Sequence, residues 1–152
     1  MMDDIKTIGL LNNLILVNND RIEGYEMAIH ETDENDLKLL FSQFIQTSVK
    51  CKSELLSEVK RLEAEAFISN RTKASFFKTW DSVKTALNTK DRKVILDACE
   101  EGEGLVKKNY EDTIREHGTD LSLNELAMLK NQYMNLKNDH DRVEAMGQSV
   151  VF

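Results

Sequence analysis

The chain has 152 residues, a usual length for one domain and enough to bury a core without disulfides or a structural metal. Its 27 acidic and 20 basic residues give a net charge of −7, which disfavours binding to nucleic acid. No segment approaches the roughly 20 apolar residues of a membrane span, and the N-terminus lacks the basic start of a signal peptide. We therefore expect a cytoplasmic protein with a single domain over residues 1–152.

The N-terminal half predicts two long amphipathic helices, which the absence of proline leaves uninterrupted. Over residues 5–31, apolar side chains recur every three or four positions, with Asn18 filling one gap. Capping residues then precede a second helix over about 36–65. Cys51 and Cys99 form no CxxC pair and fall on apolar faces, so we expect both to be buried free thiols of a reducing compartment.

The C-terminal half predicts a short helix followed by two long ones. The short helix covers residues 73–87 and would advance about 22 Å, most of the way back along the preceding helix. A long helix then ends near residue 116, before Gly118, and the last helix begins after a capping box formed by Ser122 and Glu125. Because the short helix can serve as a crossover, the pattern favours an all-α, up-down-down-up four-helix bundle. If the short helix packs as a full member, a five-helix up-down array results instead.

Three phrases carry a family resemblance: "LNNLILVNNDRIEGYEMA", "CEEGEGLVKKNYEDTI" and "NQYMNLKNDHDRV". Together they resemble a bacterial family of ferritin-like four-helix-bundle proteins whose domain has no known function. The resemblance covers nearly the whole chain and implies a ferritin-like fold, but no settled activity. Some ferritin-like proteins bind two metals and handle oxygen or iron, others have lost the ligands, and the relatives suggest a role in stress only loosely.

A di-iron carboxylate centre in such a bundle needs a Glu from each of two helices and a Glu-x-x-His from each of the other two. This chain has no Glu-x-x-His, and the residue three positions before His140 is Lys137. A looser ligand set could still converge, because several acidic residues border the apolar stripes of their helices. The candidate ligands for iron or manganese are Glu26, Glu54, Glu103 and His140.

The alternative interpretation of His140 is a neutral imidazole held by hydrogen bonds inside the bundle. Buried polar groups persist when they are bonded, and they can favour one packing over others. Other polar residues lie on the stripes of the four long helices at positions where they could meet. The sequence therefore predicts a buried polar layer that consists of Asn18, Ser48, Asn109 and Tyr133.

Other enzyme classes lack support, since the chain shows no glycine-rich phosphate loop, no nucleophile beside a plausible base and no basic-aromatic patch. The apolar C-terminal tail, residues 148–152, would dock in a groove of the same bundle or of a second copy. We therefore expect a non-enzymatic bundle without a cofactor that acts through self-association as a homo-oligomer or through a protein partner. The alternatives are a metal-binding oxidoreductase or iron-handling protein and, third, a domain that grips an amphipathic helix.

Overall fold

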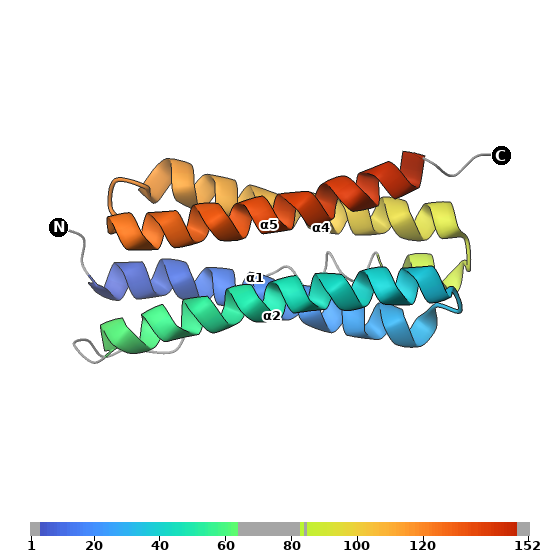
Figure 1. The fold of residues 1–152 in the computed structure, drawn as a ribbon, viewed down its shortest axis with the longest axis horizontal. Coiled ribbons are helices and arrows are strands. Elements are labelled where there is room, and N and C mark those ends of the chain that lie inside the picture. The colour runs from blue at the N-terminus through green and yellow to red at the C-terminus, as the bar shows by residue number, and fades with distance from the viewer. Residues whose placement is uncertain (1–3, 64–82, 84, 149–152) are drawn as a thin grey trace.

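The computed structural model describes residues 4–63, 83 and 85–148, and its long elements are all α-helices. The helices are α1 (Asp4–Glu31), α2 (Asn35–Glu63), α4 (Arg92–His117) and α5 (Leu123–Gln148). In Figure 1, α1 and α2 form one pair and α4 and α5 a second pair, and the two pairs lie on each other along their length. The predicted all-α bundle is confirmed.

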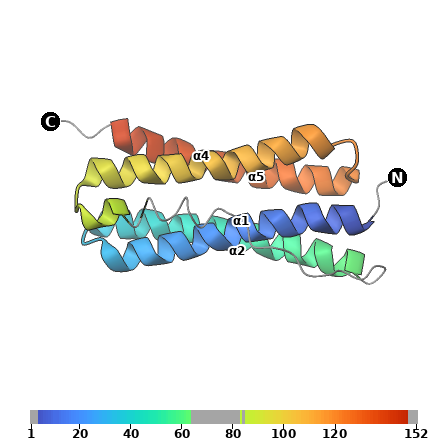
Figure 2. The ribbon, with the colours of Figure 1, turned by 180° about the vertical axis from the view of Figure 1, so that it is seen from behind.

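Contacts between the pairs show the direction of each helix. On α1, Asn18 bonds to Tyr110 of α4, whereas Tyr25, further along α1, bonds to Glu103, earlier in α4. The two helices are therefore antiparallel. The same reversal relates α2 to α5, because Glu54 contacts Gln132 whereas Arg61 contacts Glu125. Figure 2 shows α1 beside α4 from the opposite side of the molecule.

Most of the connection between α2 and α4 lies outside the described residues. The predicted short helix over 73–87 is described only at 83 and 85–87, which are helical, with Val83, Ala86 and Leu87 buried. The crossover and the ferritin-like classification therefore stay predictions. The tail residues 149–152 also lie outside the described residues. Within the described helices, no stretch is both long and apolar enough to cross a membrane.

Local signals in the sequence account for the helix ends. Asp91 precedes α4, and its carboxylate accepts hydrogen bonds from the backbone N–H groups of Lys93 and Val94. The predicted capping box before α5 is confirmed: the Ser122 hydroxyl accepts from the Glu125 N–H, and the Glu125 carboxylate accepts from the Ser122 N–H. These bonds satisfy backbone donors that the first turn of a helix leaves unpaired.

The predicted apolar stripes face the interior of the bundle. Many of their members are at most 4% exposed, and stripes from four helices pack together because burying apolar surface is favourable. The buried apolar positions with this spacing include Ile8, Leu11, Ile15, Tyr25, Leu37, Phe41, Phe44, Leu55, Val59, Leu62, Ile95, Val106, Leu129, Leu136 and Val143. Cys51 and Cys99 are buried and free, as expected.

Candidate functional site

The guanidinium of Arg21, midway along α1, is fully buried and bonds to all three other long helices. It donates two hydrogen bonds to Glu103 of α4, at 2.7 and 2.8 Å, and one to Asp139 of α5, at 3.0 Å. Its Nη1 atom donates to the carbonyl oxygen of Phe44, at 2.8 Å, and to the Ser48 hydroxyl, at 2.9 Å, both on α2. All five N–H groups of the guanidinium are thereby used.

Aromatic rings enclose this ion network. The Cζ atom of Arg21 lies 5.4 Å from the ring centre of Tyr25 and 5.3 Å from that of Phe44, within the range of cation-π contacts. The Tyr25 hydroxyl donates to Glu103 at 2.8 Å, and its ring stacks on Phe41. The Glu103 carboxylate is therefore bonded by both Arg21 and Tyr25 in an environment without solvent.

The network fixes the charge of its central cation. Burial by itself lowers the pKa of Arg21, but the attraction of Glu103 and its hydrogen bonds outweigh burial, and the pKa lies above its ordinary value. Burial, followed by the charge of Glu103, raises the pKa of Tyr25 well above 10. Arg21 therefore keeps its positive charge and Tyr25 its proton at any physiological pH.

A second chain of hydrogen bonds crosses the bundle beside the first. The Asn18 amide donates to the Tyr110 hydroxyl at 2.9 Å, and that hydroxyl donates to the Gln132 carbonyl oxygen at 2.7 Å. The Gln132 amide then donates to the Glu54 carboxylate at 3.0 Å. This chain includes one side chain from each long helix, and the Arg21 network includes at least one from each. We call the two together the polar layer; its members are Asn18, Arg21, Tyr25, Ser48, Glu54, Glu103, Tyr110, Gln132 and Asp139.

Half of the predicted polar layer occupies the expected place. Asn18 and Ser48 are fully buried members of it. Asn109 and Tyr133 are only half-buried, and their neighbours Tyr110 and Gln132 take the inward positions. Asn109 turns away and donates to a carbonyl of its own helix, while the Tyr133 hydroxyl bonds at the surface. Adjacent residues differ by about 100° around a helix, so a one-residue offset moves a side chain out of the core.

The four predicted metal ligands lie apart in the structure. Glu103 is held by Arg21, Glu54 receives the Gln132 amide, and Glu26 is exposed on α1. Among the described residues, these four side chains do not form a group of three or more converging ligand atoms. His140, expected on the inward seam of α5, is half-buried, and its neighbour Asp139 faces Arg21 instead.

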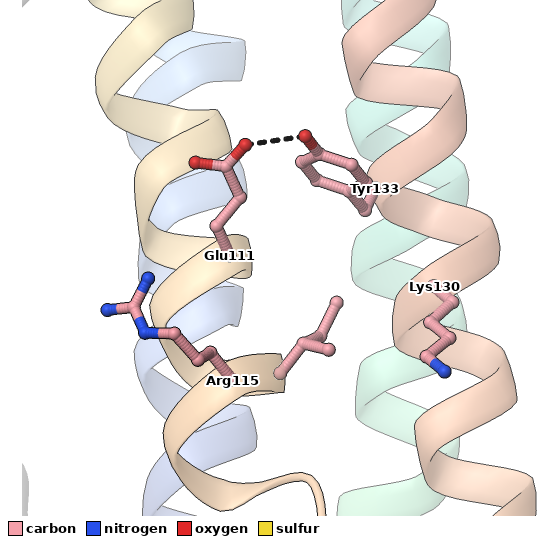
Figure 3. Close-up of a pocket in the computed structure, with 5 residues that line it drawn as sticks. Glu111, Arg115, Lys130 and Tyr133 are labelled. Carbon is pink, nitrogen blue, oxygen red and sulfur yellow. Dashed lines mark hydrogen bonds between the residues drawn. The ribbon is translucent and has the colours of Figure 1, made fainter.

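A surface cavity of about 430 Å³ lies between α4 and α5, near Tyr133 (Figure 3). Tyr133 donates a hydrogen bond across it to Glu111, and this bond, together with burial, raises the pKa of Tyr133 to about 12. Arg115, which lines the cavity on the α4 side together with Glu111, is paired with Asp112. Since several of its polar groups bond to protein neighbours, the cavity offers little that would orient a substrate.

Sequence reasoning missed Arg21, Asp139, Tyr110 and Gln132. A signal for Arg21 was present, because positions 14, 18, 21, 25 and 28 follow the alternating four-and-three spacing of an inward seam. Arg21 is the cation of that seam, and its acidic partners, Glu103 on α4 and Asp139 on α5, could have been matched to it. A buried arginine needs such partners.

Comparison with family models places most of this chain in a known family. A family model described as a domain of unknown function (DUF2383) matches residues 6–116, which include α2 and nearly all of α1 and α4. Neither the curated proteins nor the solved structures include a significant match to this chain.

Proposed function

The chain belongs to the DUF2383 family of domains of unknown function, and we propose that it is a non-enzymatic helical bundle that acts through association with a second copy of itself. The observation that carries the proposal is the Arg21 network, which uses all five guanidinium N–H groups and the carboxylates of Glu103 and Asp139 for internal bonds. A substrate would have to break these bonds to reach Glu103 or Asp139. Function is then more readily supplied by the outer surface.

The same network argues against a di-metal centre in the core. Arg21 already places a permanent positive charge within 3.0 Å of carboxylate oxygens of Glu103 and Asp139. A divalent cation at those oxygens would meet a like charge in a medium of low polarity, where repulsion is strong. The oxidoreductase or iron-handling alternative with Glu26, Glu54, Glu103 and His140 as ligands is therefore the weaker proposal.

The outer face of α2 supplies an apolar stripe suited to another helix. Val49 and Leu56 are 44% and 36% exposed, and they lie seven residues apart on one side of α2. Ile45, four residues before Val49, borders the core, and Lys52 follows Val49 by three, so these positions have the four-three-four spacing of a helix-packing seam with one lysine in it. A second α2 is a suitable occupant, because most homo-oligomers pair identical surfaces about a two-fold axis.

We propose the cytoplasm as the location of this protein, because free, buried thiols are typical of a reducing compartment.

Light scattering after size exclusion tests the proposal. We expect the full chain to elute as a dimer and a Val49→Lys/Leu56→Lys variant to elute as a monomer with an unchanged helical circular-dichroism spectrum. Leu123→Lys is the matched control, since Leu123 is 86% exposed at the start of α5 and lies off the stripe. A parent protein that stays monomeric at the highest accessible concentration overturns the proposal, as does a double variant of unchanged mass.

A further inference from the structure

Three ligand-capable side chains converge at the junction of α4 and α5, outside the polar layer. Glu100 of α4 and His140 and Glu144 of α5 each place one ligand atom within 4.8 Å of the other two. His140 and Glu144 are four residues apart and therefore share one side of α5. All three are half-buried, and the His140 side chain is 13% exposed. The two helices thus hold the three groups close together while leaving access from solvent.

The chemistry of the three groups suits a metal ion better than it suits an empty cluster of charges. Two carboxylates at such a distance repel each other unless a proton or a cation lies between them. An imidazole nitrogen and carboxylate oxygens are the donors that zinc, manganese and ferrous iron take from proteins. The set also joins both helices of the pair, so an ion bound there would link α4 to α5.

A neighbouring carboxylate can orient the imidazole. The Oδ1 atom of Asp141 lies 3.4 Å from Nδ1 of His140. If Nδ1 carries the proton, the Asp141 carboxylate accepts a hydrogen bond from it, and the lone pair of Nε2 is free for a metal. Protein histidines commonly bind zinc in this arrangement. Lys137 bonds to the other oxygen of Asp141, at 2.9 Å, which holds that carboxylate in place.

We propose that Glu100, His140 and Glu144 form a mononuclear site for a divalent transition-metal ion, and that Zn²⁺ is the ion that fits it best. One ring nitrogen and two carboxylate oxygens provide three ligands, and water completes the tetrahedron that zinc prefers. At a site of nitrogen and oxygen donors, Zn²⁺ also binds more tightly than Mn²⁺ or Fe²⁺. This site differs from the di-metal hypothesis in the bundle core and shares only His140 with it.

Calorimetric titration of the chelator-treated full chain with ZnCl₂ tests the site. We expect one Zn²⁺ per chain and an affinity at least tenfold weaker in His140→Gln and in Glu144→Gln. Asp141→Asn should weaken binding by about 10-fold, the usual effect of removing the group that orients a ligand. His30→Gln is the matched control, because His30 is exposed at the end of α1, far along the chain from the cluster, and its loss should leave the affinity unchanged.

Thermal unfolding provides a second readout. Zn²⁺ should raise the melting temperature of the parent, since a ligand that binds only the folded state stabilises it, and should not raise that of His140→Gln. The mass by light scattering should be the same with and without Zn²⁺, because all three ligands come from one chain. The proposal is overturned if the parent does not bind Zn²⁺ at a ratio of 1:1. It is also overturned if His140→Gln and Glu144→Gln bind Zn²⁺ with the same affinity as the parent. These results are independent of the α2 stripe and of the oligomeric state that it is proposed to produce.

Discussion

Replacing Arg21 with methionine should be among the most destabilising single substitutions in this protein. Methionine is unbranched and adaptable, so the change removes the charge and five donors while leaving much of the packing in place. Glu103 and Asp139 would then be left in the interior without their cation. Removing one partner of a buried ion pair costs about 3–5 kcal/mol, mostly because the other charge stays buried and uncompensated.

The expected loss is large relative to the stability of a domain, which is about 5–15 kcal/mol. For a domain of this size, about 3–5 kcal/mol corresponds to a fall in melting temperature of about 6–20 °C. Urea unfolding followed by circular dichroism measures the free energy directly. Arg115→Met is the matched control, because Arg115 also pairs with two carboxylates, Asp112 and Glu116, but is 65% exposed. Its loss should leave the unfolding free energy close to that of the parent, since solvent screens exposed pairs.

A double variant separates a charge effect from a packing effect. Adding Glu103→Gln to Arg21→Met should recover part of the lost stability, because it removes a buried negative charge that has lost its cation. A loss below about 1 kcal/mol in Arg21→Met would refute the reasoning, because neutral hydrogen bonds alone contribute about that much each. Additive losses in the double variant would refute it too.

Three further predictions concern the helix cap, the phenols and the thiols. Asp91→Ala should destabilise the protein by about 1 kcal/mol in thermal unfolding, because it removes the acceptor that caps α4. Ultraviolet titration should show Tyr133 ionising near pH 12 in the parent and closer to 10 in Glu111→Gln, whose amide cannot repel the phenolate. The Tyr133–Glu111 bond should therefore stabilise the folded protein below pH 10, where an unfolded tyrosine is still protonated, and this stabilisation should be lost as the pH rises to about 12. Burial raises the pKa of Cys51 to about 12 and that of Cys99 further, so a disulfide reagent at pH 8 should modify neither thiol until the chain is unfolded; fast reaction of the folded protein would contradict the burial.

The sequence was sufficient to predict the helices because each signal was local. The three-and-four spacing of apolar residues and the capping box formed by Ser122 and Glu125 depend on neighbours within a few positions. On α5, Leu129, Leu136 and Val143 are seven residues apart, which agrees with that spacing, and all three are buried. Ferritin-like topology is a different kind of statement, since it depends on the path between α2 and α4.

The polar layer could be predicted only in part, because hydrophobic spacing leaves a choice between adjacent residues. After Asn18, the next inward position of α1 is three or four residues on, which offers Arg21 or Ile22. A pattern based on apolarity selects Ile22, yet Arg21 is inside. The same choice occurs on α5 at Asp139 and His140. Burying a charge is unfavourable without a partner on another helix, and one helix viewed alone cannot show that the partner exists.

Two acidic residues on α4 show why the interior and the surface of this bundle should respond differently to ions. Glu103 is compensated by Arg21, a cation that is part of the chain and keeps its charge at any physiological pH. Glu100, one turn earlier, faces Glu144, and burial together with the hydrogen bond and charge of Glu144 raises its pKa. Glu100, His140 and Glu144 are the ligands that we propose for Zn²⁺, so the compensating charge there would be an ion from solution. The core is thus held by charges that belong to the chain, whereas the proposed Zn²⁺ would link α4 to α5 only when the ion is supplied.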